Sequence, residues 1–173
     1  REVELATGEL KPVICTEIGR PTSGPASDNI TYNDELTARY VIQGFVRAYA
    51  AGLTAAIWLE AVDETWLQHM YGLLQADLTP KPAYQTYGVL TRELAGATFL
   101  GFRRADVPAN VEGYDFDVGG WKRTAVWVTE EKAQNQSFKL FAVGGTLRVV
   151  AKDGSETLVE DGSVADRDAK RDG

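Results

Sequence analysis

Hydrophobic positions follow two different patterns along this chain, and the change lies near Gly96. Before Gly96, short apolar runs alternate with stretches of helical periodicity. After it, short runs rich in β-branched and aromatic residues are separated by glycine turns. The pattern predicts an α/β part over residues 1–95 and an all-β part over residues 96–173.

The first part reads as strand, helix, strand, helix. An apolar run predicts a strand within residues 11–17, and a loop rich in Gly, Pro and Ser follows it. Helical spacing predicts a helix over residues 32–51, with Thr31 as its N-cap and Gly52 after its end. Residues 53–59 predict a second strand, and a helix entered at Pro80 to Pro82 ends at Gly96. This order favours a parallel sheet whose strands are buried on both faces.

The second part reads as an antiparallel β-sandwich. Asp153-Gly154 is a strong signal for a tight hairpin. The last stretch, residues 161–173, is almost wholly polar, so we expect it to be mobile. The predicted strands cover residues 98–102, 114–118, 123–128, 138–143 and 147–151.

Composition excludes several classes of function. The 173 residues carry a formal net charge of −7, which disfavours nucleic acid or an anionic membrane as a partner. The single cysteine, Cys15, excludes an internal disulfide and a multi-cysteine metal site, and its apolar run predicts a buried side chain. A single His and dispersed carboxylates suggest no metal, and no phosphate-binding loop is present, so no cofactor is predicted.

Glu17 is the first candidate for chemistry. It closes an apolar run just before Gly19 and Pro21 break the strand. In parallel α/β folds, catalytic groups sit where strands end and loops begin. The alternative is that Glu17 caps a neighbouring amide or pairs with an arginine.

Several short motifs, in this order and spacing, resemble the clan A glycoside hydrolases, which are retaining enzymes with a (β/α)8 barrel. Lys-Pro-Val-Ile-Cys-Thr-Glu-Ile-Gly at 11–19 resembles their seventh strand, and Ala56-Ile57-Trp58 with Asp63 resembles the eighth. Residues 71–74 and 79–84 resemble the entry to the last barrel helix, and residues 94–101 the crossing into a C-terminal sandwich. The resemblance implies the last two β/α units of a TIM barrel over residues 1–95 and a small antiparallel β-sandwich, truncated at its end, over residues 96–173.

By this resemblance Glu17 is the catalytic nucleophile. Retaining glycosidases need two carboxyl groups about 5–5.5 Å apart, one to attack the anomeric carbon and one to protonate the leaving oxygen. In the clan the second group is a Glu that follows an Asn on the fourth strand, and no Asn-Glu pair occurs in this sequence. The resemblance therefore implies a fragment of a hydrolase of β-linked glycosides, inactive alone, with the first six barrel units upstream.

Four further residues are candidates for substrate binding. Trp58 fits an aromatic platform for a sugar ring, with core packing as the alternative. Asp63, Trp66 and His69 could line the mouth of the site, although a lone His is more often structural. Glu60 is a rival carboxylate, but the motif favours Glu17.

Other functions stay open at this point. A non-catalytic carbohydrate-binding or structural module would make Glu17 incidental, and an exposed Trp121 at its Gly-Gly turn could then touch carbohydrate, whereas Trp127 reads as core. An inactive hydrolase-like protein is the third reading. The residues name neither the sugar, the oligomeric state nor the compartment.

Overall fold

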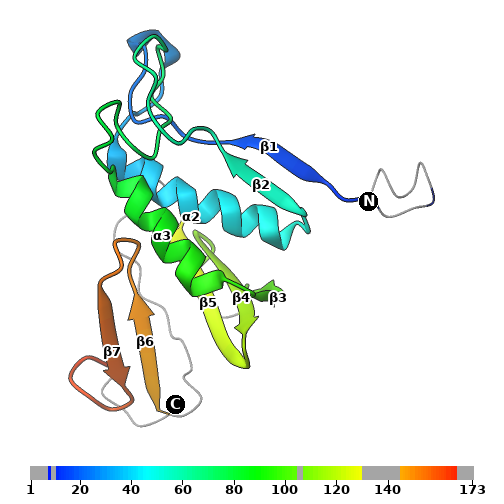
Figure 1. Cartoon of the computed structure of the whole chain (residues 1–173). Coiled ribbons are helices and arrows are strands. Elements are labelled where there is room, and N and C mark those ends of the chain that lie inside the picture. Colours follow the sequence, from blue (N-terminus) through cyan, green and yellow to red (C-terminus); the bar gives the residue numbers. More distant parts are fainter. Residues whose placement is uncertain (1–7, 9–10, 105–106, 130–144, 167–173) are drawn as a thin grey trace. The chain divides into compact units, whose positions relative to one another are not determined.

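A computed structural model describes residues 8, 11–104, 107–129 and 145–166 (Figure 1). The chain forms two compact units, Arg1–Tyr87 and Gly88–Gly173. The predicted strand at 138–143 and the end of the polar stretch from residue 167 lie outside the described residues.

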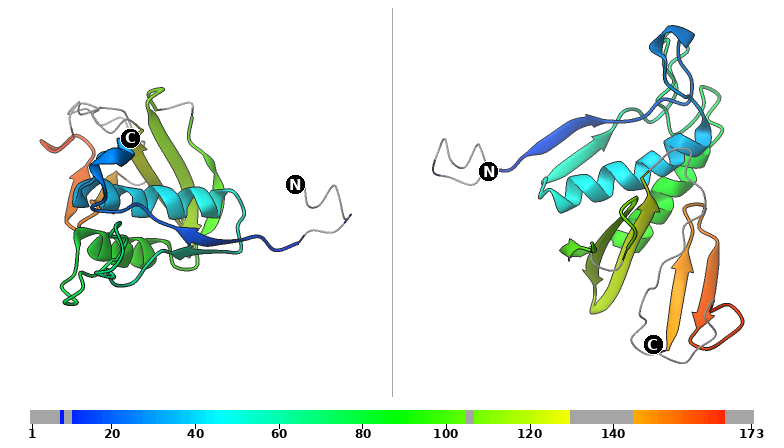
Figure 2. Two further views of the ribbon diagram at one scale, coloured as in Figure 1. Left: turned by 90° about the horizontal axis from the view of Figure 1, so that it is seen from above. Right: turned by 180° about the vertical axis from the view of Figure 1, so that it is seen from behind.

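The first unit contains the predicted parallel pair. β1 (Ile14–Ile18) pairs with β2 (Ala55–Trp58), and α2 (Asp34–Ala50) runs alongside them in every view (Figures 1 and 2). A short 3-10 helix, η1 (Ala26–Asp28), lies between β1 and α2, and α3 (Pro82–Leu94) follows β2. The predicted order of strand, helix, strand and helix is confirmed.

α2 begins later than predicted. The Asn33 side chain, not Thr31, caps it by accepting a hydrogen bond of 2.8 Å from the Leu36 amide. Asp34 and Glu35 in the first turn and Arg47 in the last turn complement the helix dipole. The expectation of Thr31 is wrong because Asn33 also suits this position and lies next to the first helical residue.

The prediction that both strands are buried on two faces is wrong for the described residues. Val13, Ile14 and Ile57 are 48%, 52% and 54% exposed, and Cys15 is only half-buried. Strand side chains point to the two faces of a sheet, and the described sheet of two strands has too few elements packed on it to cover both faces. Trp58 and Ile18 instead find partners in α2, where Ile18 lies against Gly44.

The second unit is built from two antiparallel sheets. β3 (Thr98–Phe102), β4 (Val111–Val118) and β5 (Trp121–Val128) form one sheet in that order, with Phe116 fully buried. β6 (Thr146–Val150) and β7 (Glu156–Glu160) form a hairpin. Its turn is the predicted Asp153-Gly154: the Asp153 carboxylate accepts from the Ser155 amide, and Gly154 has a φ of 83°. Both sheets agree with the antiparallel prediction, but β7 was not predicted.

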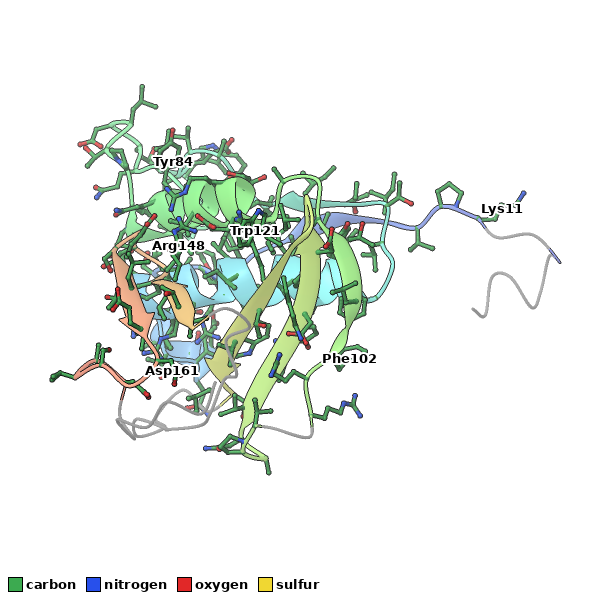
Figure 3. All side chains as sticks on the ribbon, turned by 90° about the horizontal axis from the view of Figure 1, so that it is seen from below. Lys11, Tyr84, Phe102, Trp121, Arg148 and Asp161 are labelled. Carbon is green, nitrogen blue, oxygen red and sulfur yellow. The ribbon has the colours of Figure 1, made fainter. Side chains whose placement is uncertain are left out.

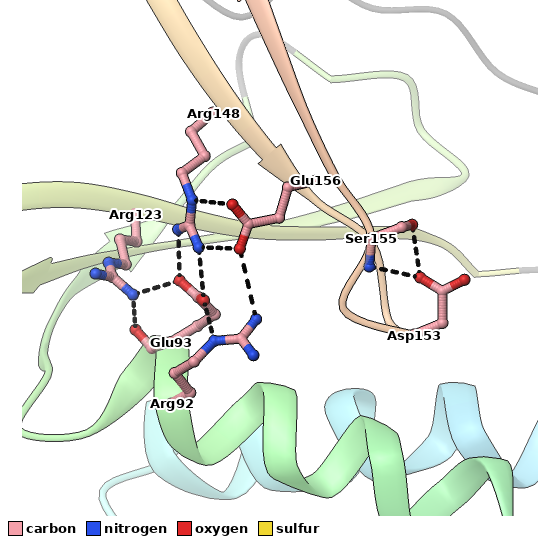
Figure 4. A network of polar contacts seen from close by, with 7 residues as sticks. All are labelled: Arg92, Glu93, Arg123, Arg148, Asp153, Ser155 and Glu156. Carbon is pink, nitrogen blue, oxygen red and sulfur yellow. Dashed lines mark hydrogen bonds and ion pairs between the residues drawn. The ribbon is translucent and has the colours of Figure 1, made fainter.

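An ionic cluster ties the C-terminal end of α3 to both sheets of this unit (Figure 4). Glu93 pairs with Arg123 of β5 at 2.5 Å and with Arg148 of β6 at 3.0 Å. Arg148 also binds Glu156 of β7 at 2.6 Å. The Arg123 guanidinium donates a further 2.7 Å bond to the Glu93 carbonyl, so it also satisfies a helix-terminal acceptor.

Two apolar side chains of β3 are exposed, and Figure 3 labels one of them, Phe102. Leu100 and Phe102 of the edge strand β3 are more than half exposed, and Arg104 lies 5.1 Å above the Phe102 ring. Among the residues that the structure describes, no helix is long and apolar enough to cross a bilayer.

Candidate active site

The carboxyl ends of β1 and β2 lie next to each other, and the two loops that leave them are bonded together. The Leu59 amide donates to the Ile18 carbonyl at 2.9 Å, which joins the strand ends. Farther out, the Thr22 amide donates to the Met70 carbonyl at 2.9 Å and the Met70 amide to the Ser23 carbonyl at 3.1 Å. The two loops, residues 19–33 after β1 and residues 59–81 after β2, are thus hydrogen-bonded to each other. We call this end of the sheet the loop edge.

Gly19 lies close to the loop after β2. A Cβ built on it would lie 2.6 Å from the Leu59 carbonyl oxygen and 3.0 Å from Cδ1 of Tyr71. Only glycine fits such a contact with backbone. The Tyr71 ring therefore lies against the chain two residues beyond Glu17.

Glu17 lies on β1, one residue before its end, and its side chain is exposed. Within the described residues its carboxylate makes no hydrogen bond or ion pair, so neither the capping nor the arginine-pairing alternative is seen. A carboxylate in this state is available to a ligand.

Glu60, the rival carboxylate, has a different environment. It lies two residues beyond the end of β2 and is half-buried, and its Oε1 has no hydrogen-bond partner among the described residues. Burial raises its pKa above the ordinary value, and repulsion from Glu64 and Asp63 adds to this. Glu60 therefore gains a proton more readily than an ordinary glutamate.

Trp58 is held in the protein interior. Only 9% of it is exposed, its ring stacks on Phe45 at 6.2 Å and tilts against Tyr40 at 6.3 Å, and both partners belong to α2. Its indole N–H donates to the Tyr71 carbonyl at 2.9 Å. These contacts favour the alternative of core packing over that of a sugar platform.

Asp63 forms an ion pair that the sequence pattern did not indicate. Its carboxylate lies 2.6 Å from the Lys81 ammonium and accepts from the Gly72 amide at 2.8 Å. Lys81 also donates to the Thr22 hydroxyl at 2.9 Å, so it joins both loops. The side chains of Lys81 and Asp63 are 5% and 10% exposed, which favours a role in holding the loop over one in contacting a sugar.

Trp66 and His69 remain accessible on the loop after β2. Trp66 is 76% exposed. His69 places its Nε2 2.6 Å from Oδ2 of Asp28, which belongs to η1 on the loop after β1. The Tyr32 hydroxyl donates to the same oxygen. Asp28, Tyr32 and Tyr71 were missed by sequence reasoning, because 41 residues separate Asp28 from His69 and no spacing signal links them.

The pKa values of this cluster reflect its hydrogen bonds. The pKa of Asp28 is lowered, first by the bond from Tyr32 and then by the bond from His69. Loss of solvent and the bond to Asp28 raise the pKa of Tyr32 to about 12. Asp28 is thus a carboxylate and Tyr32 a neutral phenol near neutral pH.

Two further features considered from the sequence are a metal site and the tryptophans of the second unit. In the described part of the chain, no group of three or more His, Cys, Asp or Glu residues could hold a metal ion. In the second unit Trp121 is 76% exposed beside its Gly-Gly turn, while Trp127 stacks on Tyr114 at 5.0 Å and 15°.

One solved structure that the chain resembles is a family 39 glycoside hydrolase from the gut symbiont Bacteroides cellulosilyticus WH2. The TM-score is 0.71 at 20% sequence identity, over 89% of this chain. The chain has a glycoside hydrolase-like fold. It spans 32% of the length of that enzyme chain. No protein-family model and no curated protein matches the sequence.

Proposed function

We propose that this chain is the C-terminal part of a retaining glycoside hydrolase that acts on β-linked glycosides, with Glu17 as its nucleophile. The observation that carries the proposal is the position of Glu17: an exposed, unbonded carboxylate next to the carboxyl end of a parallel strand, in a fold shared with a glycoside hydrolase. That strand edge is where α/β enzymes place their catalytic groups.

The reaction follows from carboxylate chemistry. A Glu17 oxygen attacks the anomeric carbon while the glycosidic C–O bond breaks and a second carboxyl group gives its proton to the leaving oxygen. The same second group then takes a proton from water, which attacks the anomeric carbon and releases Glu17. The Asn-Glu signature of that second group is absent from the sequence, so the proposal places it in barrel strands that precede this chain.

The other predicted site residues divide into two roles under this proposal. Trp66 and His69 reach the mouth of the site and contact substrate. Trp58 and Asp63 hold the loop after β2, through Tyr71 and Lys81 respectively, and so shape the site from behind. The exposed edges of the β1–β2 pair accept the neighbouring barrel strands.

Trapping of the covalent intermediate tests the nucleophile. The full-length protein is incubated with 2-deoxy-2-fluoro β-glycosides carrying a good leaving group, and the labelled peptide is sequenced by mass spectrometry. We expect the adduct on Glu17, and Glu17→Gln should lower kcat by several orders of magnitude. Glu60→Gln is the matched control, since it changes the neighbouring carboxylate and should leave the adduct on Glu17.

An adduct on Glu60, or turnover by Glu17→Gln close to that of the wild type, would falsify the assignment. The present chain by itself should hydrolyse none of these glycosides, because it supplies one carboxyl group of the two. A non-catalytic carbohydrate-binding module would instead bind glycosides and form no adduct.

A further inference from the structure

His69 is fixed on several sides by its neighbours. Asp28 holds its Nε2, the Tyr32 ring meets it edge-on with centroids 6.2 Å apart, and the Tyr71 ring lies 6.0 Å away at 37°. Gly24 also packs against the ring: a Cβ built on Gly24 would lie 2.8 Å from Cδ2 of His69. The ring nevertheless keeps 35% of its side chain exposed. A side chain that is both held and exposed is suited to contact a ligand.

The contact with Asp28 determines which ring nitrogen can accept a hydrogen bond. A carboxylate only accepts, so Nε2 must carry the proton that it shares with Asp28. In the neutral imidazole the other nitrogen, Nδ1, is then an acceptor. Among the described residues no group donates to Nδ1. With a neutral imidazole, the cluster thus presents one oriented lone pair to the surroundings.

His69, which carries Nδ1, and Glu17 lie at the same loop edge of the sheet. Tyr71, which contacts the His69 ring, lies against Gly19, and Gly19 follows Glu17 by two residues. Sugars carry hydroxyl donors around an apolar ring, so an acceptor flanked by aromatic rings matches their chemistry. An acceptor with no donor of its own also selects a hydroxyl over an ether oxygen.

We propose that Nδ1 of His69 accepts a hydrogen bond from a sugar hydroxyl of the substrate, and that Asp28 and Tyr32 are positioning residues that hold the imidazole for this contact. The inference rests on the proposed function and deepens it, because it names one substrate contact and the residues that orient it.

Two substitutions separate the substrate contact from the contact between the loops. In His69→Gln the amide nitrogen can still reach Asp28, but the acceptor at the Nδ1 position is lost. In His69→Asn the amide oxygen stays near the Nδ1 position, but the side chain no longer reaches Asp28. The full-length protein is assayed with those p-nitrophenyl β-glycosides that it turns over. We expect His69→Gln to lower kcat/KM on the order of tenfold, the value of one neutral hydrogen bond, and His69→Asn to lower it less.

The ring itself can be observed in the present chain, because His69 is its only histidine. Long-range ¹H–¹⁵N NMR at pH 8 should show a protonated Nε2 and an unprotonated Nδ1, with a slowly exchanging Nε2–H proton. Asp28→Ala should abolish that slow exchange while the chain stays folded by circular dichroism.

The following results would overturn the inference. A protonated Nδ1 in the wild-type ring removes the acceptor. Unchanged kcat/KM in His69→Gln removes the substrate contact, and a loss in His69→Asn as large as that in His69→Gln leaves only the contact between the loops. Failure of the proposed function is recognised separately, by turnover in Glu17→Gln, and the NMR result does not depend on it.

Discussion

Asp63 and Lys81 show how strongly a single pair can determine the shape of this site. Lys81 donates to both loops, to Asp63 on one and to Thr22 on the other. Both charges are nearly buried, and a buried charge without its partner is far more costly than an exposed one. The pair therefore fixes the loop after β2 against the loop after β1.

We expect Lys81→Met to lower the free energy of unfolding by about 3–5 kcal/mol, because it leaves the Asp63 carboxylate buried without its ion partner. Urea unfolding of the present chain, followed by tryptophan fluorescence, measures the change. The matched control is Arg39→Met, which breaks an exposed pair with Glu35 whose side chains are 44% and 50% exposed. The control should cost less than about 0.5 kcal/mol. Equal effects in the two variants would contradict the role of Lys81.

Residue roles could be predicted only where the local pattern determines them. The position of Glu17 near the end of a strand could be predicted, because an apolar run followed by Gly19 and Pro21 marks that strand end in the sequence; its proposed role stays a prediction. Asp63 was expected at the mouth of the site, but in the folded chain its carboxylate pairs with Lys81, which is 18 residues away in the sequence. No local spacing in the sequence predicts this ion pair. The contact of His69 with Asp28 depends in the same way on how two loops pass each other.

At the scale of elements, the contact between α2 and β1 depends on a missing side chain. Gly44 lies inside α2, and a Cβ there would be 2.6 Å from Cδ1 of Ile18. Alanine normally stabilises a helix interior by about 0.5–1 kcal/mol relative to glycine. Overpacking of a buried contact costs about 1–3 kcal/mol, so we expect the steric term to prevail here.

Gly44→Ala should therefore lower the free energy of unfolding by about 1 kcal/mol. Gly88→Ala in α3 is the matched control, because nothing lies within 4 Å of a Cβ at Gly88, and it should stabilise the chain by about 0.5–1 kcal/mol. In the double variant Gly44→Ala/Ile18→Val the clashing methyl is gone, so the two substitutions should be less destabilising together than the sum of each alone. Additive effects in thermal unfolding would show that Ile18 is not the obstacle.

The elements with strong periodicity were predicted well. Helical spacing found α2 and α3, and the apolar runs found β1, β2 and β3. β7 was missed although Thr157, Leu158 and Val159 follow the hairpin signal, because flanking glutamates make the run look polar. Contacts that form only in the folded chain could not be predicted from the local pattern. Arg148, for example, lies across from Leu158 in the hairpin and pairs with Glu156.

At the scale of the whole chain, each compact unit has its own ionic contact: the pair in the first unit is nearly buried, and the cluster in the second is partly exposed. The first uses Asp63 and Lys81, and the second uses Glu93, at the end of α3. The sequence suggested both parts of the chain and the parallel and antiparallel character of their sheets. It could not indicate that α3 contributes Glu93 to the second unit, since that depends on where Arg123 and Arg148 lie after folding.

Glu93 makes the second unit sensitive to acid. Its pKa is lowered to about 2, first by the hydrogen bond from Arg148 and then by Arg92 and the charge of Arg123, which together outweigh its burial. In the unfolded chain the same carboxyl group has its ordinary pKa of 4.5. Between these values the unfolded chain binds more protons than the folded one, so stability is full above about pH 5 and falls as the pH falls toward 2. Asp115 adds to the same trend: burial opposes the shift, but bonds from Lys122, Thr124 and Arg103 lower its pKa.

Glu93→Gln should remove about 1–3 kcal/mol of stability at pH 7 and much less at pH 2.5, because at pH 2.5 the carboxyl group of the unfolded wild-type chain is protonated and most of the pKa-linked stability is lost. Urea unfolding at pH 7, 5, 4 and 2.5 measures the difference between variant and wild type. Glu35→Gln is the matched control: its carboxylate pairs with Arg39 on an exposed helix face, so the variant should differ from the wild type by about 0.5 kcal/mol or less at every pH. A difference for Glu93→Gln that stays constant from pH 7 to 2.5 would mean that the ion pairs of Figure 4 do not hold the end of α3 to the sheets. A difference that shrinks with acid would assign that attachment to the charge of Glu93, because Gln keeps the shape of the side chain and loses only its charge.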